Sequence, residues 1–156
     1  MNVVIAVHSN TGHTVNVARA FANDLRKAGH EVDVSMVRTR GEVHPGARNF
    51  ALVKTPDLEG CDVLLVGGPV WAFSASPVIM AYVRSLEEFK GKTALPFVTM
   101  GLPWDFCGGT RAIGRMTEAL VLLGARVLDG EIVHYLFRMN QQAVNAASKR
   151  IVNRLK

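Results

Sequence analysis

The chain has 156 residues, 49% of them hydrophobic and 20% charged, and its 18 Lys and Arg residues against 13 Asp and Glu residues give a net charge of +5. This length and composition are those of one folded domain and exclude global disorder, and no run approaches the ~20 apolar residues of a membrane-spanning helix. No signal sequence precedes the first apolar run, and the two cysteines lack the spacing of a metal site, so we expect one cytoplasmic domain over residues 1–156 that holds no metal.

Apolar runs alternate with amphipathic stretches along the chain, which is the pattern of a parallel sheet covered by helices on both faces. The runs predict five strands, at residues 3–7, 32–37, 63–66, 94–100 and 127–133. Helical spacing of apolar residues predicts helices around 18–25, 77–86 and 113–123, and a last one from about Gln141. Residues 38–60 fit this pattern poorly, and we interpret them as a long connection with a short helix at 47–53.

Five parallel strands joined by right-handed crossovers form an open, doubly wound α/β sheet. The strand order 2-1-3-4-5 is one of the two common arrangements, and it is the one that we predict here. In that order the winding reverses between strands 1 and 3, and ligands bind there, beyond the carboxyl ends of the strands. The loops after strands 1, 3 and 4 are therefore the candidate site.

The densest group of basic residues lies in the predicted last helix, at Lys149, Arg150, Arg154 and Lys156. A basic chain can bind nucleic acid, an anionic membrane surface or an acidic protein. Apolar residues at helical spacing share this segment, and no aromatic residues interleave with its charges as a base-stacking surface would require. We therefore interpret the charges as the solvated face of a terminal helix and predict no nucleic-acid binding.

The segment after the first strand, Ser9-Asn10-Thr11-Gly12-His13-Thr14, combines hydroxyl side chains with a glycine in front of a predicted helix. Free N–H groups and the positive end of the helix dipole attract an anion to such a position. Three hydroxyl residues are more than one helix cap requires, and the loop matches neither a Walker motif nor G-x-G-x-x-G. We predict a phosphate site made of neutral donors, to which a protonated His13 would add charge.

The pattern S-x-T-G-x-T after a first strand resembles the phosphate loop of the flavodoxin family. Residues 57–71 are similar to the third strand of that family and to the loop after it, and the similarity extends over most of the chain. The resemblance implies a flavodoxin-like fold with FMN as the cofactor. It also implies which residues hold the phosphate: Ser9, Asn10, Thr11, Gly12, His13 and Thr14.

The resemblance further implies that two loops contact the flavin ring. The loop after strand 3 would pack on one ring face, with Trp71 as the first candidate for contact and Phe73 as the second. The loop after strand 4 would contact the pyrimidine edge and the other face, and its Gly108-Gly109 pair is also similar to quinone-reductase relatives. The expected ring-binding residues are Pro69, Val70, Trp71, Ala72, Phe73, Met100, Gly101, Leu102, Trp104, Gly108 and Gly109.

Two redox functions are open to an FMN protein of this kind. The first is electron transfer, in which the exposed flavin edge meets a redox partner protein. The second is a reductase that takes hydride from NAD(P)H and passes it to a quinone, a flavin or a similar small acceptor. We favour electron transfer, because no second nucleotide motif is visible; an interaction module without flavin is a third hypothesis. The sequence identifies no catalytic residue, and it leaves a homo-oligomer open.

Overall fold

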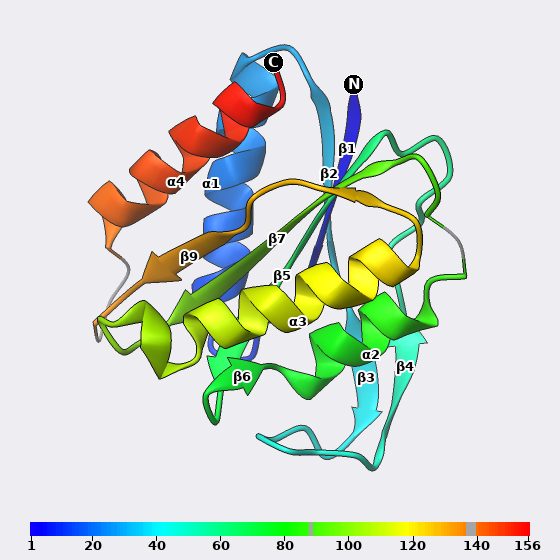
Figure 1. Cartoon of the computed structure of the whole chain (residues 1–156), viewed down its shortest axis with the longest axis vertical. Helices are drawn as coiled ribbons and strands as arrows, with labels where there is room; N and C mark the ends of the chain where they lie inside the picture. Colours follow the sequence, from blue (N-terminus) through cyan, green and yellow to red (C-terminus); the bar gives the residue numbers. More distant parts are fainter. Residues whose placement is uncertain (88, 137–139) are drawn as a thin grey trace.

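A parallel β-sheet forms the centre of the fold (Figure 1). The computed structural model describes residues 1–87, 89–136 and 140–156. The strands run in the order β2-β1-β5-β7, and two short strands, β8 and β9, both pair with β7. The fold class and the order 2-1-3-4-5 are confirmed, with the fifth strand divided in two. The bounds are β1 (Asn2–Val7), β2 (Glu31–Met36), β5 (Val63–Trp71), β7 (Thr93–Met100), β8 (Arg126–Val127) and β9 (Glu131–His134).

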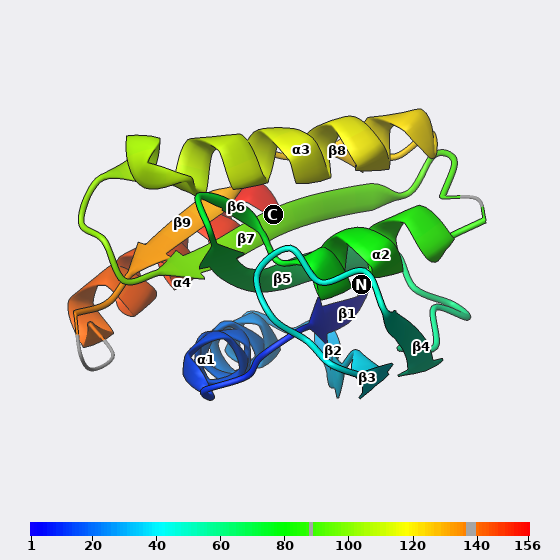
Figure 2. The ribbon, with the colours of Figure 1, turned by 90° about the horizontal axis from the view of Figure 1, so that it is seen from below.

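Helices cover both faces of the sheet (Figure 2). On one face lie α1 (His13–Lys27) and α4 (Gln141–Arg154), and on the other lie α2 (Pro77–Ser85) and α3 (Gly109–Leu122). Each of these helices lies where apolar spacing predicts one. In the part of the chain that the structure describes, no helix combines the length and the apolar character needed to cross a membrane.

Each layer of helices packs on its own apolar core. Leu65 of β5 contributes to the core under α1 and α4, and its neighbour Leu64 contributes to the core under α2 and α3; both side chains are fully buried. Because successive side chains of a strand point to opposite faces, a strand between two cores must be apolar at every position. This requirement explains the continuous apolar runs of β1, β5 and β7.

The helices begin in two different ways. The side chains of Ser76 and Asn140 accept hydrogen bonds from the N–H groups of Ile79 and Ala143, each at 3.2 Å, and so cap α2 and α4. In contrast, α1 and α3 follow glycines with positive φ, Gly12 at +92° and Gly108 at +114°, and no side chain in residues 1–87, 89–136 or 140–156 caps either helix.

The interpretation of residues 38–60 is wrong in one respect. In place of a short helix at 47–53, the segment contains a two-stranded antiparallel sheet of β3 (Arg38–Gly41) and β4 (Phe50–Lys54). Phe50 and Leu52 pack against the core under α2 and α3, while Ala51 and Val53 between and after them are exposed. This alternation has the period of a strand, and the partial burial of Phe50 and Leu52 on one side favours β4 over a helix.

The basic face of α4 is only partly the solvated surface that the sequence predicts. Arg150 and Arg154 both donate hydrogen bonds to the carboxylate of Glu131 in β9, with an Arg150 Nη2 to Glu131 Oε2 distance of 2.7 Å. Glu131 is buried. A buried carboxylate requires paired charges, so these two arginines hold α4 against the sheet instead of standing free in water.

Candidate functional site

The three predicted loops meet at one edge of the sheet. Val7, at the end of β1, pairs with Gly67 of β5, and Pro69 of β5 pairs with Thr99 of β7. Just beyond β1, the N–H of His8 donates to the carbonyl of Gly67 at 2.9 Å. The parallel register therefore brings the segments after β1, β5 and β7 together at their carboxyl ends.

The loop after β1 leaves the first turn of α1 open to an anion. Gly12 turns the chain with its positive φ, and its N–H donates to the hydroxyl oxygen of Ser9 at 3.2 Å. No side chain of the described residues caps the helix, and its first turn contains no acidic residue. The free N–H groups and the helix dipole there favour a negatively charged ligand.

The side chains of this loop differ in where they point. Asn10 and Thr11 are exposed, so both are accessible to a ligand. The hydroxyl of Thr14 lies instead in the core, 2.8 Å from the hydroxyl of Thr99 in β7. That hydrogen bond fixes the start of α1 against β7.

A tyrosine that sequence reasoning missed joins the loop to the far side of the site. The ring of Tyr135, just after β9, stacks on the imidazole of His13 with centroids 4.0 Å apart and planes 16° from parallel. The N–H of Tyr135 donates to the carbonyl of Met100 at 3.0 Å. The sequence could have indicated Tyr135, because this residue lies just beyond the carboxyl end of the predicted fifth strand.

The chain after β5 folds back as a tight hairpin. Ala72 and Phe73 have positive φ, 48° and 62°, and lead into β6 (Ser74–Ala75), which pairs with the end of β5. A Cβ on Gly108 would lie 2.5 Å from the Cα of Phe73, so the hairpin packs directly on this glycine. The absence of a side chain at Gly108 is therefore what allows the loops after β5 and β7 to touch.

A small pocket lies between these two loops. It has a volume of about 170 Å³ and is lined by Val70, Ala72, Phe73, Met100, Gly101, Leu102 and Cys107. Most of these residues are among those expected to contact a flavin ring. Pockets that enclose a ligand usually measure about 300 Å³ or more, so a ring bound here would be only partly enclosed.

The two tryptophans lie outside this small pocket. Trp71 borders a larger pocket of about 690 Å³ on the other side of the hairpin, next to Pro77 and Met80. Trp104 is 55% exposed and stacks on Phe106, with ring centroids 6.1 Å apart. Contact of either indole with the flavin stays a prediction.

Two histidines hold the backbone around the site. His8 is buried, its Nδ1 lies 2.8 Å from the hydroxyl oxygen of Ser76, and burial lowers its pKa to about 4, so the imidazole is neutral at pH 7. His134 contacts the loop after β7 through both ring nitrogens. Its Nδ1 lies 2.7 Å from the carbonyl oxygen of Leu102, and its Nε2 lies 2.5 Å from the carboxylate of Asp105 in the short 3₁₀ helix η1 (Asp105–Cys107).

These features fit the cofactor that the resemblance implies. The uncapped start of α1 would receive the phosphate of FMN, and the pocket between the hairpin and the loop after β7 would receive one part of the ring. Within the described part of the chain, no carboxylate borders that pocket, and Asp105 is the acidic residue on the neighbouring loop. The site therefore offers neutral donors and apolar surface, as a phosphate and a planar ring require.

Comparisons with known proteins agree with this fold. A family model described as flavodoxin matches residues 35–133. A Streptococcus pneumoniae TIGR4 flavodoxin structure has a TM-score of 0.70 at 17% identity over 98% of this chain and 96% of that one. Oxidised flavodoxin 1 from Bacillus cereus gives 0.70 at 20% identity over 96% and 94%, and an archaeal flavodoxin gives 0.66 at 14% over 98% and 95%.

A search of curated protein sequences found no match. The likenesses to solved structures, at this level of identity, establish the fold. The family model covers more than half of the chain, and the sequence it matches contains the hairpin after β5 and the loop after β7. The chain therefore belongs to the flavodoxin family, whose cofactor is FMN.

Proposed function

We propose that residues 1–156 form one domain that binds FMN at this sheet edge and transfers electrons to a redox partner protein. Bound FMN supplies one- and two-electron redox chemistry, and the protein orients it and sets its potential. The N–H groups at the start of α1, with Ser9 and Thr11, would hold the phosphate. The hairpin after β5 and the loop after β7 would hold the ring between them.

The observation that carries the proposal is the exposed apolar surface around the small pocket. Phe73, Leu102, Trp104 and Phe106 all lie on the two ring-binding loops, and each is more than a third exposed, up to 81% for Phe106. Large apolar side chains gathered on one surface are typical of a protein–protein contact. A partner that docks on this surface would reach the exposed edge of the ring, which suits electron transfer between proteins.

The charge of the chain indicates what kind of partner would dock. A net charge of +5 favours association with an acidic protein and disfavours association with a basic one. The same charge would stabilise a reduced, anionic flavin more than an acidic protein does, because opposite charges at short range interact at the level of kcal/mol. We therefore expect the potential for the second one-electron reduction of the bound FMN to be less negative than in acidic members of the family.

The first experiment tests the cofactor and its phosphate site. We expect the purified protein to bind FMN more tightly than riboflavin, which lacks the phosphate, as measured by quenching of flavin fluorescence. Thr11→Ala should reduce this preference for FMN by about tenfold. Thr55→Ala, which removes an exposed hydroxyl after β4, is the control and should leave the preference unchanged.

The second experiment tests electron transfer. The FMN-loaded protein is reduced chemically and mixed with an acidic or a basic haem protein as the electron acceptor, in a stopped-flow instrument. We expect faster reduction of the acidic haem protein, and a rate that falls as salt is added. Slow transfer to both acceptors, together with rapid NAD(P)H oxidation in the presence of a quinone, would replace this proposal with the reductase.

A further inference from the structure

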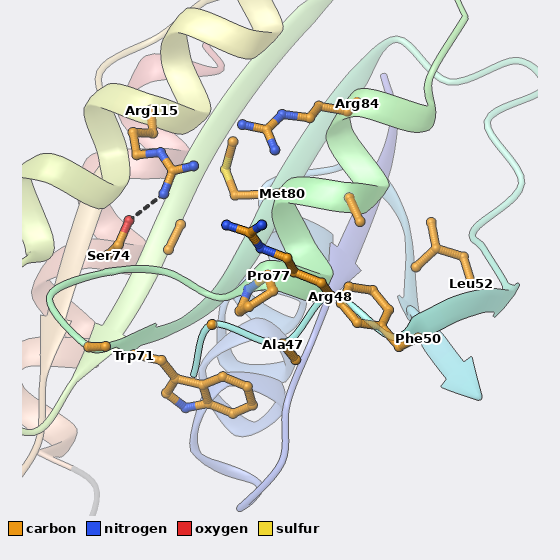
Figure 3. A pocket seen from close by; sticks show the side chains of 14 residues that line it. Ala47, Arg48, Phe50, Leu52, Trp71, Ser74, Pro77, Met80, Arg84 and Arg115 are labelled. Carbon is orange, nitrogen blue, oxygen red and sulfur yellow. Dashed lines mark hydrogen bonds between the residues drawn. The ribbon is translucent and has the colours of Figure 1, made fainter. Parts of the chain in front are cut away.

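A second pocket lies beside the hairpin, on the face of the sheet that carries α2 and α3 (Figure 3). Its volume is about 690 Å³, which is within the range of pockets that bind small organic molecules. Residues 46–52, α2, α3 and the hairpin form its walls. The phosphate loop after β1 does not border this pocket, and of the residues expected to contact the flavin ring only Trp71 and Ala72 line it.

Three arginines from three different elements line this pocket. Arg48 comes from the segment before β4, Arg84 from α2 and Arg115 from α3, and their side chains extend toward one another around Met80 (Figure 3). Arg115 Nη1 donates to the hydroxyl oxygen of Ser74 at 2.7 Å, which fixes this guanidinium against the hairpin. The three positive charges thus converge on one space from separate parts of the chain.

Among the residues that the structure describes, no acidic side chain lines the pocket. Across residues 1–87, 89–136 and 140–156, no ion pair involves Arg48, Arg84 or Arg115. One carboxylate, that of Glu118, borders an adjoining pocket together with Arg84 and Arg115. Guanidinium groups that converge without a carboxylate between them repel one another, and an anion placed between them removes that repulsion.

The remaining wall of the pocket is apolar and partly aromatic. Trp71, Phe50, Leu52, Pro77 and Met80 supply it. Guanidinium groups bind the oxygens of carboxylates and phosphates through paired N–H donors, and an indole stacks on a planar ring. The pocket thus combines recognition of an oxyanion with recognition of a flat apolar group.

We infer that this arginine pocket, formed by Arg48, Arg84, Arg115, Trp71 and Phe50, binds a small organic anion that joins a planar ring to a phosphate or carboxylate group. Ala72 borders both the arginine pocket and the small pocket between the flavin loops. A ligand in the arginine pocket would therefore lie against the same hairpin that packs beside the flavin ring. The inference does not depend on the proposed electron transfer, because it rests on residues outside the phosphate loop.

The test measures ligand binding by isothermal titration calorimetry on protein that carries one equivalent of FMN in the phosphate loop. Unbound FMN is removed first, because it is itself a planar ring with a phosphate. AMP represents a planar ring with a phosphate, and benzene-1,3,5-tricarboxylate represents a planar ring with carboxylates. We expect at least one of them to bind about tenfold more tightly than inorganic phosphate, and we expect neutral adenosine not to bind detectably. Binding of AMP alone assigns a phosphate ester to the pocket, and binding of the tricarboxylate alone assigns a carboxylate.

Substitutions then locate the binding. Arg84→Gln and Arg115→Gln should each weaken binding of the ring anion by about tenfold or more. Arg19→Gln removes the same charge from α1 on the opposite face of the sheet, and Thr11→Ala alters the phosphate loop; both should bind the anion as the unmodified protein does. Arg84 and Arg19 are exposed, so both variants are expected to fold, which circular dichroism checks.

Three results would overturn the inference. The first is that neither ring anion binds. The second is that inorganic phosphate binds as tightly as AMP and the tricarboxylate, since the ring would then contribute nothing. The third is that Arg19→Gln or Thr11→Ala weakens binding as much as Arg84→Gln does, because the anion would then respond to net charge or occupy the phosphate loop.

Discussion

The imidazole of His8 lies edge-on to the indole of Trp71, with ring centroids 5.2 Å apart and ring planes at 86°. His8 directly precedes the phosphate loop, and Trp71 ends β5 where the hairpin begins. The same imidazole also contacts the hydroxyl of Ser76, and this hydroxyl caps α2. One buried side chain therefore joins the loop after β1, the hairpin and the start of α2.

This placement predicts a pH-dependent stability. Burial lowers the pKa of His8 from 6.5 to about 4, so between these values the unfolded chain binds a proton that the folded chain does not bind. The contribution of His8 to the free energy of unfolding is complete above about pH 6.5. As the pH falls toward 4, on the order of 2–3 kcal/mol of this stability is lost. Urea unfolding at a series of pH values from 4 to 8 measures it.

The contribution of His8 is isolated by comparing variants. His8→Gln should flatten the fall in unfolding free energy between pH 6.5 and 4, because glutamine does not titrate. His44→Gln, at an exposed histidine between β3 and β4, should retain the full fall. An unchanged pH dependence in His8→Gln would assign the effect to other groups.

Substitution by alanine should have opposite effects on stability at two glycines, Gly108 before α3 and Gly114 inside it. Gly108→Ala places a Cβ 2.5 Å from the Cα of Phe73 at a positive φ, so we expect a loss of stability of about 1–3 kcal/mol and weaker FMN binding. A Cβ added to Gly114, inside α3, would meet nothing within 4 Å, and Gly114→Ala should stabilise the protein by roughly 0.5–1 kcal/mol. Thermal unfolding and FMN titration of both variants check this pair, and equal effects would contradict it.

Tyr82 offers a substitution that should stabilise the protein. Its side chain is 1% exposed, and its hydroxyl has no hydrogen-bond partner among the described residues. Burial also raises the pKa of the phenol above its usual value. A buried hydroxyl without a partner costs free energy, so Tyr82→Phe should raise the free energy of unfolding by about 1 kcal/mol. A decrease of similar size would show that the hydroxyl has a partner in solution.

The contact between α4 and β9 predicts a destabilising substitution. Arg150→Met leaves the buried carboxylate of Glu131 with Arg154 as its remaining partner, and we expect a loss of about 1–3 kcal/mol. Lys149→Met, at the neighbouring exposed residue, controls for the loss of one positive charge on α4 and should change stability little. Denaturant unfolding of both variants distinguishes pairing with Glu131 from general charge.

The main strands, the four helices and their order follow from patterns that are local in the sequence. Apolar runs identify β1, β5 and β7, and Pro77, which suits the first turn of a helix, identifies the start of α2. The two-stranded sheet at 38–54 was missed, because a short strand on the surface shows only two alternating, partly buried residues, Phe50 and Leu52. Such a brief alternation does not distinguish a strand from a short helix.

By itself the sequence determined the fold class and the three loops that follow strands, because these depend on residue types and spacings within a few turns of chain. The strand order was predicted from the two arrangements that are common in such folds. Only the tertiary structure decided which distant side chains meet. Tyr135 stacks on His13, and Arg115 turns toward Arg48 and Arg84, although these residues lie tens of positions apart. Their meeting depends on strand register and on how the helices pack on the sheet, and neither is encoded in any local pattern.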